Sequence, residues 1–303
     1  MSETRVEDPR GPGAVEDLTL AERAANFDAR RGRRVRGLMI TVSLLYVGIL
    51  LVAPLAGIVS SALKGGTGNA LKTFSDRTAL HALWLTFLIM LVTVAVTTVL
   101  GVVVALVLAR DRFPGKRLLS AVVDLPLGVS PVIVGLMAVL LFGNGGWFQS
   151  FFAARGIQII FALPSMILVT VFISIPFVIR EVVPVLQELG IEEEQAAWTL
   201  GASRLQTFFR VTLPNIRWGL LYGIALSAAR AIGEVGAVLI VSGSLQGQTE
   251  TATLFILRVF DQSRSAAQEQ PGFVIALTLA LFSVVLLIGI EFFKRREIKE
   301  AHR

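Results

Sequence analysis

Long apolar runs alternate with short polar segments along the chain. The run at residues 37–63 contains no charged side chain, and five further apolar runs follow it. Runs of about 20 apolar residues predict transmembrane helices, because a helix satisfies its own backbone hydrogen bonds in lipid. The predicted spans are residues 38–62, 82–109, 121–142, 158–180, 217–241 and 271–293. The pattern therefore predicts an all-α integral membrane protein with six transmembrane helices.

Proline residues make the third predicted span irregular. Pro126 and Pro131 lie in its first half, as does Asp124. Proline removes a backbone hydrogen bond and kinks or breaks a helix, so we expect a broken helix here. Irregular backbone at membrane depth is tolerated only where it is buried or lines a cavity. Two interpretations of Asp124 are open: a cap at the start of this helix, or a charged partner for another helix across the bundle.

The distribution of Lys and Arg residues predicts the orientation. With a cytoplasmic N-terminus, six spans place 21 of the 28 Lys and Arg residues on the cytoplasmic side and only six on the outer side. Basic residues are enriched in cytoplasmic segments, so both termini are expected in the cytoplasm. The expected parts are a disordered basic tail (1–36), a first helix that is retained rather than cleaved as a signal peptide (37–63), a main transmembrane domain (77–293) and a second cytoplasmic tail (294–303).

The composition excludes several kinds of site. Hydrophobic residues make up 54% of the chain and charged residues 17%, and the mean hydropathy is +0.72. The chain has no Cys and two His residues, so neither a disulfide nor a Cys- or His-based metal site is expected. The net charge of +6 is explained by basic residues that flank the spans, and nucleic acid is not an expected partner. The chain has no G-x-x-x-x-G-K-[ST] phosphate loop and no catalytic triad, so we expect no enzymatic activity and no bound cofactor.

The most polar internal stretch lies between the fourth and fifth predicted spans, on the cytoplasmic side. Three Glu residues at 192–194 stand where the first turn of a short helix favours negative charge. Gly201 follows where a left-handed C-cap belongs. Ser203 and Gln206 have the spacing of a capping box, which predicts a second helix ending at Pro214.

Two interpretations of this helical pair follow from its residues. Ala196 and Ala197 give it a small apolar face, which permits close approach by a partner. Alternatively, the pair is an amphipathic hairpin that lies on the inner leaflet.

The helical pair resembles the "EAA" loop of ABC-importer permeases. In that loop E-A-A is followed after three residues by G, and after nine more by I-x-L-P. The matching positions here are Gln195, Ala196, Ala197, Gly201, Val211, Leu213 and Pro214. Gln195 and Val211 depart from the pattern, and the adjacent Glu194 can supply the missing carboxylate from a different helix face. The resemblance implies that residues 194–197, Gly201, Leu213 and Pro214 dock into a groove on a cytoplasmic ATPase.

Further stretches are similar to the sulfate/thiosulfate branch of these permeases, and most similar to its W-type subunit. They are "LARDRFPGK", "DLPLGVSPVIVG", "FVIREVVPVLQELGIEEEQAAWTLGAS" and "ARAIGEVGAVLIVSG". The resemblance covers residues 80–293. Molybdate permeases share a version of "ARAIGE", so molybdate and tungstate are the alternative substrates.

The resemblance also implies a set of partners. A permease of this branch resides in the bacterial inner membrane and pairs with a second, homologous permease subunit. A cytoplasmic ABC ATPase dimer binds the ATP, and an extracytoplasmic sulfate-binding protein delivers the anion. The alternative class is a secondary anion transporter, which works in lipid without an ATPase; such carriers often contain two structural repeats, and none is evident here.

Two ionisable residues fall inside the fifth predicted span. Arg230 lies 12 residues beyond Trp218, which is about 18 Å along a helix and near the middle of the membrane. Glu234 follows four residues later on the same face. Ionisable groups at this depth face the bundle interior or an aqueous path. They are either a structural ion pair or the positive element of an anion pathway, with Glu234 orienting Arg230.

Overall fold

The computed structural model describes residues 12–301 of the chain, and the side chains of residues 36–290. It divides into two compact units, residues 1–57 and 58–303. All regular elements in the described part of the chain are helical, which confirms the predicted all-α class.

The first unit consists of most of helix α1 (Pro12–Ala62). Residues 36–62 of this helix are apolar enough to cross a membrane, as predicted. The disorder expected for residues 1–36 is not what the structure shows from Pro12 onward, because α1 continues through this segment. Its Ala, Glu and Arg residues are strong helix formers, and extending an existing helix costs little. Residues 1–11 of the expected tail lie outside the described residues.

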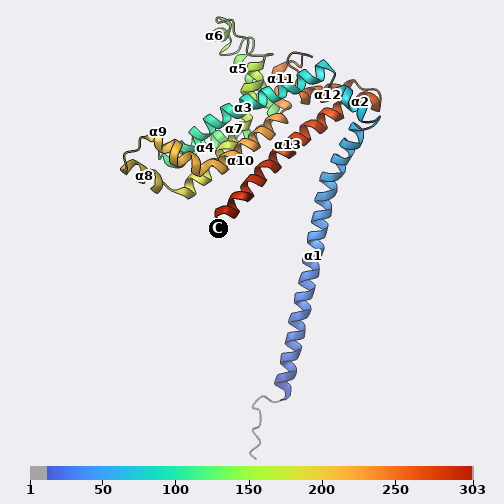
Figure 1. Cartoon of the computed structure of the whole chain (residues 1–303), viewed down its shortest axis with the longest axis vertical. Helices are drawn as coiled ribbons and strands as arrows, with labels where there is room; N and C mark the ends of the chain where they lie inside the picture. The colour runs from blue at the N-terminus through green and yellow to red at the C-terminus, as the bar shows by residue number, and fades with distance from the viewer. Residues whose placement is uncertain (1–11, 302–303) are drawn as a thin grey trace, which may run out of the picture. The chain divides into compact units, whose positions relative to one another are not determined.

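The second unit is a helical bundle with short helices at both ends (Figure 1). Its elements in chain order are α2 (Thr67–Thr73), α3 (Arg77–Arg110), α4 (Lys116–Gly128), α5 (Pro131–Phe142), α6 (Gln149–Ala153), α7 (Leu163–Leu189), α8 (Glu192–Thr199), α9 (Arg204–Thr207), the π-helical turn η1 (Phe208–Thr212), α10 (Leu213–Ile232), α11 (Gly236–Ser242), α12 (Ala252–Gln262) and α13 (Ala266–Ala301). Helices α3, α7 and α10 pack along one another at its centre (Figure 1). Helices α8 and α9 lie at one end of this centre, and α11 and α12 lie toward the other.

The helices in the described part of the chain allow the six membrane crossings that the sequence predicts. Helices α1, α3, α7 and α13 are each long and apolar enough to cross a membrane. Two bent pairs, α4 with α5 and α9–α10 with α11, raise the number to six if each pair is one span. The third span is broken as predicted, with a bend of 112° between α4 and α5.

The fifth span is also broken, which the sequence analysis did not anticipate. It was predicted as one helix over residues 217–241, but α10 ends at Ile232 and α11 begins at Gly236 with a bend of 55°. Gly233 is the C-cap residue of α10, and glycine has a low helix propensity. The side chain of Glu234 accepts a hydrogen bond from the Ala237 N–H at 2.8 Å, which satisfies a backbone donor at the start of α11.

The two broken spans contact each other beside their breaks. A Cβ atom placed on Gly135 of α5 would lie 2.9 Å from the carbonyl oxygen of Ala237 in α11. A Cβ on Gly236 would lie 3.1 Å from Cβ of Pro131, the first residue of α5. Glycine at both positions lets the two short helices approach closely, as small residues do in membrane bundles.

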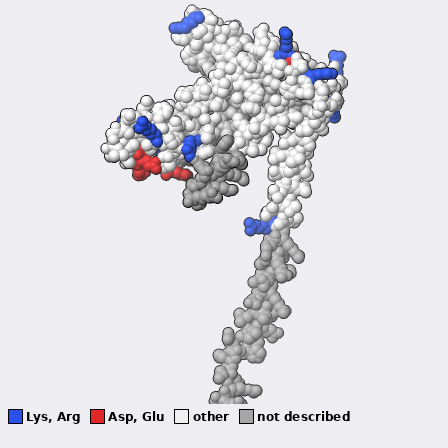
Figure 2. All heavy atoms as spheres, in the orientation of Figure 1, with Lys and Arg blue, Asp and Glu red and all other residues white. Residues whose placement is uncertain are grey.

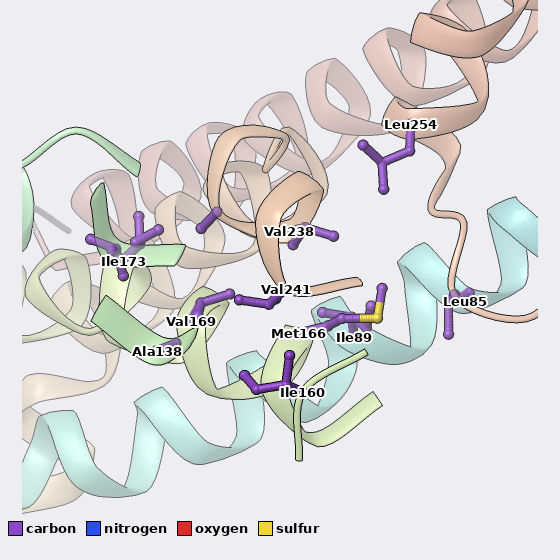
Figure 3. Packing of buried hydrophobic residues seen from close by; sticks show 12 residues of the cluster. Leu85, Ile89, Ala138, Ile160, Met166, Val169, Ile173, Val238, Val241 and Leu254 are labelled. Carbon is purple, nitrogen blue, oxygen red and sulfur yellow. The ribbon is translucent and has the colours of Figure 1, made fainter. Parts of the chain in front are cut away.

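Side-chain packing holds the short helices against the long ones. One buried cluster combines residues of α3, α5, α7, α11 and α12 with Ile160 of the loop before α7 (Figure 3). Its members are Leu85, Ile89, Val134, Ala138, Ile160, Met166, Val169, Ile173, Ala237, Val238, Val241 and Leu254. A second cluster joins α3, α7 and α10 nearer to α8, around Val182, Leu186 and Ile216. A buried hydroxyl contact of 3.0 Å between Thr97 of α3 and Ser227 of α10 adds a polar link between helices.

Candidate functional site

The turn between α8 and α9 has the hydrogen bonds of a Schellman motif. Gly201 has φ +85°, a left-handed conformation that favours glycine. Its N–H donates to the carbonyl oxygen of Trp198 at 3.0 Å, and the Ala202 N–H donates to that of Ala197 at 3.0 Å. The predicted C-cap is therefore confirmed, and it fixes the angle at which the chain leaves α8.

The second helix of the pair begins as predicted and ends elsewhere. Ser203 and Gln206 form both hydrogen bonds of the capping box. The prediction that Pro214 ends this helix is wrong, because the helical backbone continues from Arg204 to Ile232. Proline lacks an N–H, and η1, which ends two residues before Pro214, shifts the hydrogen bonding so that the Leu213 N–H donates to the Phe208 carbonyl. The second helix of the pair and the fifth span thus form one continuous helix.

The helical pair presents large apolar side chains at its surface. The exposed fractions are 88% for Leu200, 71% for Leu205 and 58% for Phe209. Gln195, Ala196 and Gly201 are exposed beside them, and Ala197 is half-buried. Acidic side chains gather at the α8 end of the bundle, with basic ones close by (Figure 2). Glu192 and Glu193, in the first turn of α8, are exposed. An apolar patch with a charged rim is typical of a protein-interaction surface.

Glu194 has a different position from its neighbours. Its side chain is 12% exposed, and its carboxylate lies 3.0 Å from the guanidinium of Arg110, at the end of α3. The same oxygen accepts a hydrogen bond from the Thr212 hydroxyl at 3.0 Å. Arg110 also donates to the Leu186 carbonyl of α7 at 2.8 Å. Glu194 therefore ties α8 directly to α3 and η1, and through Arg110 to α7. Its carboxylate does not face outward.

A second link joins α8 to α10. The Asn215 side chain donates a hydrogen bond to the carboxylate of Glu193. Leu213 is half-buried and Pro214 is exposed beside it. The two ends of the residue 192–214 segment are therefore held together by side chains, and the segment is one compact body attached to the bundle.

Arg230 and Glu234 form an ion pair at the break of the fifth span. The distance from Arg230 Nη1 to Glu234 Oε2 is 2.7 Å. The Glu234 side chain is 2% exposed and the Arg230 side chain 28% exposed. The Thr253 hydroxyl of α12 donates to the Glu234 carbonyl at 2.9 Å. Glu234 is thus fixed from three directions, while the guanidinium of Arg230 remains partly open.

Asp124 does not contact Arg230. It accepts a hydrogen bond of 2.9 Å from Nε of Arg180 in α7. Asp124 is thus a charged partner of another helix, as one interpretation expected, but the partner is Arg180 and not Arg230. The other interpretation, a cap at the start of the helix, is wrong. Helix α4 begins at Lys116, so Asp124 lies well inside it and cannot cap its start, and its side chain faces α7.

One further buried ion pair was not found from the sequence. Glu250 is 1% exposed and binds Arg258 of α12 through both oxygens, at 2.6 and 3.1 Å. Arg258 was counted only as a positive charge of an outer loop. Among the described residues, no group of three or more His, Cys, Asp or Glu side chains could hold a metal ion.

Comparison with known proteins assigns this arrangement to a family. Residues 97–299 match the model of the binding-protein-dependent transport system inner membrane component. The chain belongs to this family. The matched region contains the helical pair, both broken spans and the Arg230–Glu234 pair. The chain is therefore an inner-membrane transport component and not the ATPase, in agreement with the sequence.

Individual relatives agree with the branch expected from the motifs. The chain is 46% identical over 263 residues to the sulfate transport system permease protein CysW of Synechocystis, covering 87% of this chain and 94% of that protein. It is 36% identical over 247 residues to the sulfate transport system permease protein CysT of the same organism, covering 82% and 85% of the two chains. The expected resemblance to the W-type subunit is confirmed.

The fold agrees with that of a solved transporter. A chain of the bacterial alginate ABC transporter, in complex with alginate pentasaccharide-bound periplasmic protein, superimposes with a TM-score of 0.72 at 17% identity, covering 89% of this permease and 96% of that chain. At this identity the match concerns the fold alone. The predicted permease fold is thereby confirmed.

Proposed function

We propose that this permease is the transmembrane subunit of an ATP-driven sulfate or thiosulfate importer. The observation that carries the proposal is the similarity to CysW, which extends over nearly the full length of both chains. Molybdate or tungstate is the second candidate substrate, because the "ARAIGE" stretch at the Arg230–Glu234 pair resembles a version of this motif in molybdate permeases. In either case the substrate moves into the cytoplasm.

The proposed partners follow from the family. A second permease similar to CysT completes the pathway, two ATPase subunits bind the helical pairs, and an extracytoplasmic sulfate-binding protein supplies the anion. Both termini and the helical pair then lie in the cytoplasm, in agreement with the excess of Lys and Arg residues on that side.

The helical pair is the element through which the ATPase acts. Gln195, Ala196, Ala197 and Gly201 form its exposed small-residue surface, and Leu200, Leu205 and Phe209 add exposed apolar area. Glu194 and Leu213 attach this surface to the bundle, and the exposed Pro214 lies beside it. Closure of an ATPase dimer would displace the whole segment, because its internal contacts hold it as one body.

The displacement reaches the middle of the membrane along one helix. Residues 204–232 are continuous, and at 1.5 Å per residue they span about 43 Å. Their far end is the break at residues 233–235, beside the break of the third span. Rigid-body motion of this helix would change how α5 and α11 pack and so open or close the path.

In the proposed mechanism, Arg230 stabilises the anion electrostatically. Its partly open guanidinium contributes positive potential at the break, and the buried Glu234 fixes its orientation through their ion pair. An anion entering a low-dielectric pathway requires such compensation.

Uptake of labelled sulfate tests the proposal. The permease is reconstituted with the proposed second permease, ATPase and binding protein, and molybdate is added as a competitor. ATP-dependent sulfate uptake that excess molybdate does not reduce is expected. Preferential uptake of molybdate would move the assignment to the second candidate. If no ATP-hydrolysing subunit co-purified with the permease, the proposal would fail.

A further inference from the structure

A groove at the α8–α9 end of the bundle is not used by the proposed transport mechanism. It lies between α4 and α7 and is bounded by the loop that follows α3. The cavity has a volume of about 760 Å³. This is within the range of sites that hold small organic ligands.

The walls of the groove are mainly apolar. They come from Leu108, Phe113, Val123, Ile179 and Val183. Val123 and Val183 also pack against the second buried cluster, so the walls are anchored in the bundle. Walls of this kind accept hydrocarbon and provide no hydrogen bonds for a small hydrated ion.

Three cations surround this apolar space. Lys116, Arg117 and Arg180 all line the groove, and Asp124 is the one carboxylate among the lining residues. Asp124 accepts a hydrogen bond from the Nε–H of Arg180. Lys116 donates one hydrogen bond to the Asp111 carbonyl at 3.1 Å, and its ammonium group has further N–H donors for a ligand. Among the described residues, no carboxylate forms a salt bridge with Arg117. The groove therefore has a net positive charge.

We propose that this groove binds an anionic phospholipid, with the phosphate at Lys116, Arg117 and Arg180 and the first part of an acyl chain against the apolar walls. The proposal rests on the proposed orientation, which places the groove in the cytoplasmic leaflet. Basic pockets between transmembrane helices on the cytoplasmic side bind anionic headgroups. Arginine pairs with phosphate oxygens through two parallel hydrogen bonds, which suits Arg117 and Arg180.

A bound lipid would also affect the third span. Helix α4 packs principally against α7, and it leads directly into the break at residues 129–130. A lipid between α4 and α7 would fix the distance between them. Sulfate uptake should then depend on anionic lipid in the membrane.

Lipid retention by the assembled transporter tests the site. The complex is purified in mild detergent with phosphatidylglycerol and phosphatidylcholine at equal concentration, and bound lipid is counted by native mass spectrometry. Arg117→Gln and Arg180→Gln should each lower the affinity for phosphatidylglycerol about fivefold, as expected for one cation near an anionic headgroup. Arg112→Gln is the matched control, because Arg112 lies in the loop between α3 and α4, near Arg117 in the chain, and does not line the groove.

Asp124→Asn distinguishes lipid binding from a merely structural ion pair. Removing this carboxylate frees Arg180 and deletes the negative charge, so the affinity for phosphatidylglycerol should rise. If the Arg180–Asp124 pair only supported the fold, Asp124→Asn and Arg180→Gln would change retention in the same direction.

Several outcomes would overturn the proposal. Equal retention of both lipids would mean that the groove does not select charge. Displacement of the lipid by millimolar inorganic sulfate would identify a small-anion site. Retention by the isolated permease alone, and not by the complex, would show that a partner subunit covers the groove. Uptake and ATPase co-purification are measured on the same preparation, so failure of lipid binding is separable from failure of the proposed function.

Discussion

The guanidinium of Arg110 lies 3.0 Å from the carboxylate of Glu194, and this ion pair joins the end of α3 to α8. The two side chains are 17% and 12% exposed. The pair stands at the base of the surface proposed to bind the ATPase, so the position of that surface depends on it.

Replacing Arg110 should loosen the helical pair without unfolding the bundle. Arg110→Ala leaves the carboxylate of Glu194 largely buried with only the Thr212 hydroxyl as a partner. Losing one member of a buried pair costs about 3–5 kcal/mol, much of which local opening of α8 can relieve. We expect faster hydrogen exchange over residues 191–203 and less sulfate transported per ATP hydrolysed. Arg112→Ala is the control for loss of one cation at the same end of α3, because Arg112 is exposed. Unchanged exchange in Arg110→Ala would contradict the role of the pair.

Gly201 should be sensitive to any side chain because of its backbone conformation. No atom lies within 4 Å of a Cβ built there, so Gly201→Ala tests φ +85° alone. A left-handed conformation costs about 1–2 kcal/mol for an L-residue, and relaxation of the turn should rotate α8. Uptake per ATP should fall, and it should fall further in Gly201→Trp while membrane insertion persists. Gly156→Ala is the matched control, since Gly156 has φ +67° and open space in the loop between α6 and α7. Equal effects of Gly201→Ala and Gly156→Ala on coupling would contradict the prediction.

The sequence predicts the elements that depend on local patterns. Apolar runs identified the spans, and the left-handed Gly201 and the Ser203–Gln206 capping box were predicted from residue types at fixed spacing. The break of the third span followed from Pro126 and Pro131. Each of these features depends on residues within about one helical turn or within a single transmembrane span.

Features that depend on distant contacts were missed. Asp124 pairs with Arg180, which is 56 residues away, and Glu194 pairs with Arg110, which is 84 residues away. Pairings between such distant residues leave no recognisable spacing pattern in a single sequence. The segment around Gly233 contains no proline, so its small residues were interpreted as the packing surface of a continuous helix. Pro214 was misread because η1 allows a proline early in α10 without ending the helix.

Arg230 should affect transport more than assembly. Its side chain is partly open, whereas its partner Glu234 is also held by the Ala237 N–H. Arg230→Gln removes the positive charge and should reduce sulfate uptake about tenfold, which corresponds to about 1.4 kcal/mol of lost anion stabilisation. Arg230→Lys should recover part of the uptake, because it keeps the charge. Assembly is measured by co-purification of the ATPase. Loss of the complex in Arg230→Gln, with recovery only in combination with Glu234→Gln, would identify a purely structural ion pair.

The close crossing of α5 and α11 should tolerate no added atom at Gly135. A methyl group there would stand 2.9 Å from both the Ala237 carbonyl oxygen and Cβ of Ile240. Neither atom is the end of a flexible side chain, so the two short helices must separate, at a cost of about 1–3 kcal/mol. Gly135→Ala should lower the melting temperature of the complex and change uptake, because the crossing lies beside both helix breaks. Gly128→Ala is the control in the same span, since nothing lies within 4 Å of its Cβ position. If both variants melted and transported alike, the proposed contribution of this crossing to transport would be wrong.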